Sequence, residues 1–171
     1  MLMGSRGVAY ATEPASQSSA TFSGVVVEKP VDKRAQFLKS YLDAYDSPLA
    51  PYAQDFVDNA DRYQLDWRLL PAISGVESGF GKKIPAYSYN AWGWGIYGNS
   101  VLRFNSWPEA IQTISKGLRE GYLRDNPDSS PFIIGPTYAA STTWAVRVNS
   151  FMDQIGYFSL RDPKSSLSLA L

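Results

Sequence analysis

The sequence has neither cysteine nor histidine in its 171 residues. Without cysteine, the fold contains no disulfide bond and no thiolate zinc site. Without histidine, Ser-His-Asp and Cys-His catalysis are excluded, together with most transition-metal sites. Acid–base chemistry near neutral pH must therefore use a carboxyl, lysine or tyrosine side chain, and a carboxyl group that burial keeps protonated suits it best.

The chain also lacks net charge, because 16 basic and 16 acidic residues cancel. No global field draws it to nucleic acid or to anionic lipid, so nucleic-acid binding is not supported. No stretch is long and apolar enough to span a membrane. The hydrophobic content of 44% instead indicates one folded domain with a substantial core.

The two ends differ from the middle in composition. Residues 1–31 include a segment rich in Ser, Thr, Ala and Pro, and we expect a flexible leader there. Within it, residues 8–11 (VAYA) resemble the small-x-small end of a signal peptide, although no apolar run precedes them. A truncated signal and a chance resemblance both stay open. We expect the folded domain over residues 32–160 and a disordered tail over 161–171.

The hydrophobic spacing predicts a mainly α domain of five or six helices, with a small β-hairpin or loop insertion within residues 82–105. The expected helices cover residues 33–46, 49–63, 66–79, 106–118 and 142–155. The last two should bury Ala110, Ile111, Ile114 and Leu118 in one helix and Trp144, Val148, Phe151, Met152 and Ile155 in the other. The third is apolar nearly all round and should be the buried central helix, starting late or bending at Pro71 and ending at Gly79. The Pro-rich stretch 126–136 is expected to form a loop.

Glu77 is the only carboxylate between Asp66 and Glu109, and it lies near the end of the apolar third helix. The helix dipole and apolar neighbours both disfavour its ionised form. A carboxyl group kept protonated near neutrality can donate a proton to a glycosidic oxygen. Glu77 is therefore a candidate general acid, although a solvated glutamate at a helix end is the alternative interpretation.

A loop rich in glycine and aromatic residues follows Glu77. Its rings are Tyr87, Tyr89, Trp92, Trp94 and Tyr97. Flat rings with a polar edge bind sugars well, and glycines let the backbone approach a ligand closely. Some of these rings are expected to fill the core instead. Ser88 and Asn90, in the same loop, would orient Glu77 or hold an N-acetyl group, and the alternative is that they serve turn geometry alone.

Residues 65–80 (LDWRLLPAISGVESGF) resemble the catalytic helix of the lysozyme-like superfamily, where soluble lytic transglycosylases and goose-type lysozymes share a helix ending in Glu-Ser-x-Phe. The segment 88–93 (SYNAWG) is similar to the loop that follows in that group. Residues 94–111 are more similar to bacterial endo-β-N-acetylglucosaminidases of the same superfamily. Tyr138 and residues 144–148 (WAVRV) resemble its closing tyrosine and helix.

The resemblance implies a lysozyme-like catalytic domain over residues 32–160, with Glu77 as the catalytic acid. It also implies that Ser88 and Asn90 line the site and that Tyr138 faces it. Together with the loop residues, the candidates for substrate binding are Ser78, Ser88, Tyr89, Asn90, Trp92, Trp94, Tyr97 and Tyr138. The chain departs from the transglycosylase pattern at Gly95-Ile96-Tyr97, where Gly-Leu-Met-Gln is expected. The absent glutamine leaves open which subfamily's product chemistry applies.

Ordinary glycosidases use two carboxyl groups, but residues 78–108 contain none. Only acids more distant in sequence remain as a second group, namely Asp66, Glu109, Glu120 and Asp125. We favour a lytic transglycosylase, in which Glu77 protonates the leaving oxygen and then activates the C6 hydroxyl of the same muramyl residue. The alternative is a hydrolytic endo-β-N-acetylglucosaminidase or muramidase that uses the substrate's N-acetyl group.

Two functions of another class stay open, an inactive cell-wall glycan-binding module and a wall-assembly scaffold. The expected partner is the glycan strand of bacterial peptidoglycan, and no metal or organic cofactor is expected, because general acid catalysis on a glycoside requires neither. Such a substrate implies an extracellular, periplasmic or cell-wall location. Membrane anchoring through an upstream segment missing from this sequence stays open.

Overall fold

The structure, a computed structural model, describes residues 32–97 and 100–161. The expected leader (1–31) and all but the first residue of the expected tail (161–171) lie outside the described residues, so those two predictions stay untested. The described part is mainly helical, with six α-helices and one two-stranded hairpin, which confirms the predicted fold class at this level.

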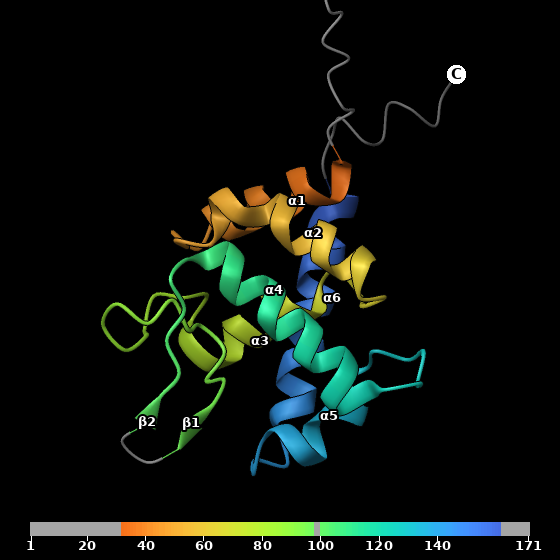
Figure 1. The fold of residues 1–171 in the computed structure, drawn as a ribbon. Coiled ribbons are helices and arrows are strands. Elements are labelled where there is room, and N and C mark those ends of the chain that lie inside the picture. The colour runs from red at the N-terminus through yellow and green to blue at the C-terminus, as the bar shows by residue number, and fades with distance from the viewer. Residues whose placement is uncertain (1–31, 98–99, 162–171) are drawn as a thin grey trace, which may run out of the picture. The chain divides into compact units, whose positions relative to one another are not determined.

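The elements follow one another as Figure 1 shows. In chain order they are α1 (Lys33–Asp43), the 3₁₀ turn η1 (Ala50–Tyr52), α2 (Ala53–Arg62), α3 (Leu69–Ser78), β1 (Ile96–Tyr97), β2 (Ser100–Val101), α4 (Trp107–Gly117), the π-helical turn η2 (Leu118–Leu123), α5 (Pro131–Tyr138) and α6 (Trp144–Leu160). The antiparallel strands pair Ile96 with Val101 and Tyr97 with Ser100. The predicted small hairpin is therefore present.

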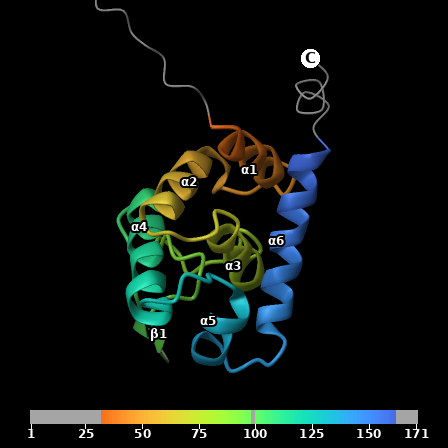
Figure 2. The same cartoon turned by 90° about the vertical axis from the view of Figure 1, so that its right-hand side faces the viewer.

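Helix α3 lies at the centre, with α1 and α2, α4, α5 and α6 around it (Figure 2). Eight of its ten residues are buried, as its all-round apolar sequence predicts. The helix begins at Leu69, three residues after Asp66, whose carboxylate accepts a hydrogen bond from the Arg68 amide at 2.9 Å. Pro71 lies in the first turn, where its missing N–H removes no intrahelical bond. The expected late start is confirmed.

The end of α3 is set by glycine, as predicted. Gly79 adopts a left-handed conformation with φ of +59°, and its amide bonds to the Gly75 carbonyl at 3.2 Å. The Phe80 amide bonds to the Ser74 carbonyl at 3.0 Å, so two carbonyls of the last turn find partners. This stop leaves Glu77 in the last turn, facing the loop that follows.

Helices α4 and α6 bury the faces that the sequence predicts. The buried side chains are Ala110, Ile111, Ile114 and Leu118 on one side and Trp144, Val148, Met152 and Ile155 on the other. Helix α6 continues to Leu160, five residues beyond the predicted end. The loop predicted over 126–136 is wrong from Pro131 onward, because Ser130 caps α5 and Pro131 occupies its first position, where proline is tolerated.

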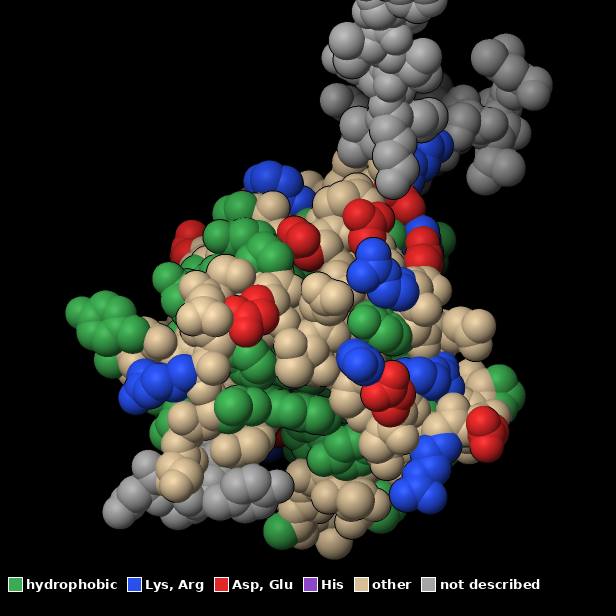
Figure 3. All heavy atoms as spheres, viewed as in Figure 1, with side chains coloured by type: hydrophobic (Ala, Val, Ile, Leu, Met, Phe, Trp, Pro, Cys, Tyr) green, Lys and Arg blue, Asp and Glu red, His purple; other side chains and the backbone are tan. Residues whose placement is uncertain are grey.

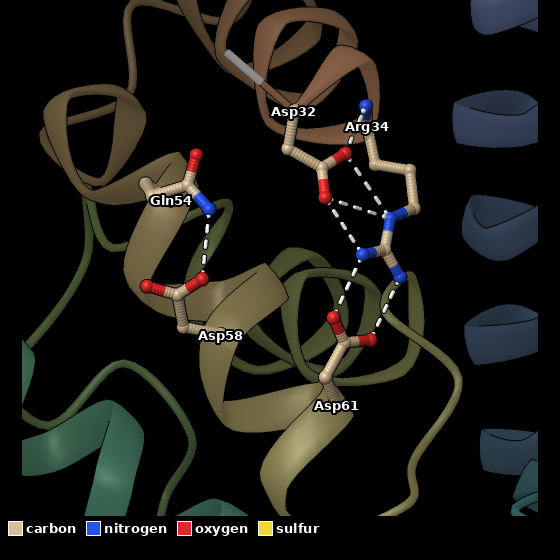
Figure 4. A network of polar contacts seen from close by, with 5 residues as sticks. All are labelled: Asp32, Arg34, Gln54, Asp58 and Asp61. Carbon is tan, nitrogen blue, oxygen red and sulfur yellow. Dashed lines mark hydrogen bonds and ion pairs between the residues drawn. The ribbon is translucent and has the colours of Figure 1, made fainter. Parts of the chain in front are cut away.

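A polar network joins the start of α1 to the end of α2 (Figure 4). Asp32 caps α1 by accepting from the Arg34 amide at 2.8 Å, and it also pairs with the Arg34 guanidinium at 2.7 Å. The same guanidinium binds both carboxylate oxygens of Asp61, at 2.8 and 2.7 Å. The Asp61 side chain is 56% exposed, so solvent screens this pair and its contribution to stability is small.

Candidate active site

Glu77 is the penultimate residue of α3, and its side chain is exposed. The burial expected from its apolar helix is therefore wrong. Glu77 is exposed because the loop residue next to its carboxyl group is Gly93, which has no side chain to cover the group and is itself exposed. Solvent and solutes can reach the carboxyl group of Glu77 from this side.

One oxygen of that carboxyl group is held from α6. Trp144, the first residue of α6, donates its indole N–H to Glu77 Oε1 at 2.7 Å. The indole is 2% exposed, so its position is set by packing. A short bond to a carboxylate is stronger than a bond between neutral groups. Trp144 therefore fixes the direction of the Glu77 side chain across 67 residues of sequence.

The other oxygen of Glu77 faces the glycine-rich loop. A Cβ atom placed on Gly93 would lie 3.3 Å from Oε2 and 3.9 Å from the carboxyl carbon. The φ angle of Gly93 is +65°, which residues with a side chain rarely adopt. Glycine at this position therefore leaves Oε2 uncovered.

Four aromatic rings form a continuous row that starts beside Glu77. Tyr138 stacks on Trp144 with 4.7 Å between ring centroids and 26° between ring planes. Tyr138 lies 5.6 Å from Tyr122 and 6.0 Å from Trp94, and those two rings are 5.7 Å apart. The row therefore runs from the indole that binds Glu77 to the glycine-rich loop. Next to the hairpin the molecular surface is hollowed, and hydrophobic side chains border the hollow (Figure 3).

Tyr138 joins the end of α5 to the loop. Its hydroxyl donates to the Trp92 carbonyl at 2.7 Å. Burial raises the pKa of Tyr138 well above its usual range, and the charge of Glu77 and the neighbouring Tyr122 raise it further. Tyr138 therefore remains a neutral hydrogen-bond donor at neutral pH. It lies near Glu77, as the sequence implies, but its hydroxyl is engaged in holding the loop.

Three of the polar residues implied for substrate binding are buried and bonded within the protein. Ser78 donates to the Ala91 carbonyl at 2.8 Å and accepts from the Gly81 amide at 2.8 Å. Asn90 is 2% exposed and donates to the carbonyls of Trp94 and Leu102, at 2.7 and 3.0 Å. Their polar atoms hold the loop, so the expectation that they contact a glycan is corrected.

Ser88 takes part in the same arrangement. It is fully buried, its hydroxyl accepts from the Asn90 amide at 3.2 Å, and its carbonyl accepts from the Phe104 amide at 2.9 Å. Asn90 Oδ1 in turn accepts from the amides of Trp92 and Trp94, at 3.3 and 3.0 Å. Of the two interpretations left open for Ser88 and Asn90, turn geometry is the one that these bonds support.

The aromatic residues of the loop divide into core and surface, as expected. Trp92 is fully buried and donates its indole N–H to the Leu70 carbonyl at 2.9 Å, so its expected contact with substrate is corrected. Tyr89 is 38% exposed and packs edge-on against Trp107. Trp94 is half-buried in the aromatic row. The Tyr97 side chain lies outside what the structure describes.

The site includes three residues that sequence reasoning missed. Trp144 is predicted as an inward residue of its helix, but nothing in its spacing links it to Glu77. Tyr122 belongs to η2, whose π-helical register differs from the spacing used to predict helices, and such turns are frequent at functional sites. Gly93 carries a detectable signal, because it stands between two tryptophans in the glycine-rich loop and glycine lets the backbone approach a ligand closely.

The distant acids are engaged elsewhere. Asp66 precedes the N-terminus of the ten-residue α3, about 15 Å from the end that carries Glu77, and it pairs with Arg68 at 2.6 Å. Glu109 accepts from the amide and the side chain of Asn105, both at 2.8 Å. Glu120 lies 3.9 Å from Lys116, and Asp125 is exposed in the turn after η2. None of these four has a hydrogen bond to Glu77 among the contacts of the described residues.

One further cavity of the described residues has no ionisable lining. A cavity of about 430 Å³ lies between α5 and the start of α6, lined by Phe132, Pro136, Thr142 and Ala145 among others, but no ionisable side chain lines it. Residues 32–97 and 100–161 contain no cluster of three or more potential metal ligands. Over the same residues, no helix has the length and apolar character needed to cross a membrane.

Comparison with protein-family models and with curated proteins found no match for this chain.

Proposed function

We propose that this protein cleaves the glycan strands of peptidoglycan, with a lysozyme-like domain and with Glu77 as its single general acid and base. The observation that carries the proposal is the difference between the surroundings of the two Glu77 carboxyl oxygens. One oxygen is fixed at 2.7 Å by the Trp144 indole, while the other is open beside Gly93. A general acid needs this combination of a fixed direction and an accessible oxygen.

The surroundings of Glu77 support a sugar as the substrate. The aromatic row of Trp144, Tyr138, Tyr122 and Trp94 lies next to the carboxyl group. Trp144 is buried, but the other three rings are half-buried and can offer apolar surface to a pyranose. The sequence of α3 and of the following loop supports the same assignment, because both resemble the lysozyme-like superfamily. The mainly α fold, with Glu77 at the end of its buried central helix, is compatible with that family.

The proposed reaction needs only one carboxyl group. Protonated Glu77 donates its proton to the glycosidic oxygen, the bond from C1 to that oxygen breaks, and the leaving sugar keeps the electron pair. The resulting carboxylate then accepts the proton of the C6 hydroxyl while O6 bonds to C1 of the same muramyl residue. The products are a free hydroxyl and an anhydro-muramyl end, no water is consumed, and Glu77 is protonated again.

Within residues 32–97 and 100–161 no carboxylate is hydrogen-bonded to Glu77, and this favours the proposed route over the ordinary two-carboxylate mechanisms. Asp66 and Glu109 hold other groups, as described above, and Glu120 lies near a lysine. A second acid placed to activate water, or to attack C1, is therefore missing from the contacts of Glu77 in the described residues. The C6 hydroxyl and the N-acetyl group of the substrate are the remaining nucleophiles.

One observation favours a second candidate, hydrolysis with the N-acetyl group as nucleophile. The Glu77 side chain is exposed, so water can reach the position from which it would complete such a reaction. The enzyme would then be an endo-β-N-acetylglucosaminidase or a muramidase. Both candidates assign the same role to Glu77 in the first step and differ only in the group that attacks C1.

Mass spectrometry of the sugars released from purified peptidoglycan tests the proposal. The parent protein is expected to release fragments with anhydro-muramyl ends, and a Glu77→Gln variant is expected to release none. Reducing ends would instead establish hydrolysis, and the sugar that bears them would separate a muramidase from a glucosaminidase. Absence of release by the parent, with retained binding to peptidoglycan, would refute the enzyme and favour a glycan-binding module.

A further inference from the structure

The contact between Trp144 and Glu77 has a consequence for where the carboxyl proton can reside. An indole N–H is a donor only and has no lone pair with which to accept a hydrogen bond. In a neutral carboxyl group the carbonyl oxygen is the stronger acceptor, so the bond from Trp144 Nε1 to Glu77 Oε1 at 2.7 Å favours Oε1 as the unprotonated oxygen. When Glu77 is neutral, its proton then resides on Oε2.

The indole itself is tightly constrained. Tyr138 stacks on one face, and the Tyr138 hydroxyl is anchored on the Trp92 carbonyl at 2.7 Å. Helix α5 also approaches closely, because a Cβ atom on Gly135 would lie 3.4 Å from the Trp144 ring. With 2% of its surface exposed, the indole has little room to turn away from Glu77. The donor is therefore preorganised by packing from α5 and the loop.

Oε2 is the oxygen that a ligand can approach. It lies opposite Gly93, which is exposed and has no side chain to cover it. We propose that Trp144 is a positioning residue that confines the transferable proton of Glu77 to Oε2, the oxygen left open by Gly93. The assignment of this proton to a glycosidic oxygen rests on the proposed function, whereas its location on Oε2 rests on the geometry alone.

The bond between Trp144 and Glu77, on which the proton location depends, can be tested by NMR without any substrate. The five tryptophans give five indole N–H signals in a ¹⁵N-labelled sample. The Trp144 signal, identified by its loss in Trp144→Phe, is expected to move with pH as Glu77 ionises, and to stop moving in Glu77→Gln. Tyr138, the other ionisable group against the indole, stays neutral in this range because its pKa is raised well above its usual value.

Trp92 provides the matched control in the same spectrum. Its indole is also buried and also donates, at 2.9 Å, but to the backbone carbonyl of Leu70, which does not titrate. Its signal is expected to be independent of pH and identical in the parent and in Glu77→Gln. If Trp144→Phe does not fold, the parent and Glu77→Gln still suffice, because one of five signals must lose its pH dependence. A set of five signals with no such difference would overturn the inference.

Turnover of peptidoglycan by the same variants separates the two proposals. Trp144→Phe is expected to lower kcat by about 10- to 100-fold with KM within about twofold, because a misdirected acid slows the chemical step without weakening glycan binding. Unchanged kcat in a folded Trp144→Phe protein would overturn the positioning role. A pH-dependent Trp144 signal in a parent protein that releases no sugar would refute the proposed function and leave the bond from Trp144 to Glu77 intact.

Discussion

Replacing Gly93 with alanine tests whether the open side of Glu77 matters for turnover. The added methyl group would lie 3.3 Å from Glu77 Oε2 and 3.9 Å from the carboxyl carbon. A separation of 3.3 Å is tighter than ordinary contact, so the carboxyl group must shift by a few tenths of an ångström. The methyl group would also cover the oxygen from which the proton is expected to leave.

The substitution has a second effect, on the backbone. The φ angle of Gly93 is +65°, and a residue with a Cβ atom in this left-handed region loses about 1–2 kcal/mol. For a domain of this size, each kcal/mol lowers Tm by roughly 2–8 °C. General acid catalysis contributes about 10²–10⁴ in rate, so a partly blocked acid should lower kcat by at least about tenfold. The loss of turnover and the loss of stability must therefore be measured separately.

Gly79 offers a matched control for the backbone effect. Its φ of +59° is nearly the same, but a Cβ atom placed on it has no heavy atom within 4 Å. Gly79→Ala should therefore lose a similar free energy of unfolding without touching Glu77. Both variants are compared with the parent by initial rates of sugar release from peptidoglycan, at a temperature well below the Tm of each protein.

The expected result is a similar fall in Tm for both variants and a fall in kcat for Gly93→Ala alone. Equal rates in the two variants would refute the reasoning, because Oε2 would then not be the oxygen that must stay open. If kcat falls in both Gly93→Ala and Gly79→Ala, the strained backbone, and not the methyl group at position 93, is the cause.

Three further predictions concern stability. Ser78→Ala removes a buried hydroxyl that bonds in three directions, so the free energy of unfolding should fall by about 1–3 kcal/mol in denaturant titration. Burial raises the pKa of Asp66, but bonds from Arg68 outweigh it and hold that pKa below its usual value. The stabilisation from the ionised Asp66 carboxylate is present above its unfolded pKa of about 3.9 and is lost as pH falls through its lower folded pKa. The free energy of unfolding that Arg68→Met loses relative to the parent should therefore shrink towards pH 2, as measured by acid unfolding. Asp61→Asn breaks only the solvent-screened pair with Arg34, and denaturant titration should detect a loss below about 1 kcal/mol.

The sequence predicts those parts of the fold that depend on local rules. Apolar spacing identifies the buried faces of α4 and α6, and Gly79 identifies the end of α3. Helix α5 is missed because its two prolines resemble a loop signal. Pro131 stands at the first helical position, where proline is favoured, and Pro136 removes only one further bond from a helix of eight residues.

The sequence could not decide between a buried and a solvated Glu77, because the exposure of this side chain depends on residues far along the chain. Spacing shows which helical face is apolar, but it does not show which element packs over the last turn of α3. Here Trp144 covers one oxygen from α6, while Gly93 leaves the other uncovered. Both contacts arise from tertiary packing and not from the period of the helix.

The segment 88–93 has a role that differs from the one its resemblance implies, and the difference explains how it can still serve Glu77. The side chains of Ser88 and Asn90 hydrogen-bond to backbone groups of the loop, including the amide and the carbonyl of Trp94. These bonds hold the chain on both sides of Gly93 in the left-handed turn that brings it against Oε2. The polar residues of this segment therefore act on the site through the shape of the loop, and their loss should displace Gly93 before it affects any contact with a ligand.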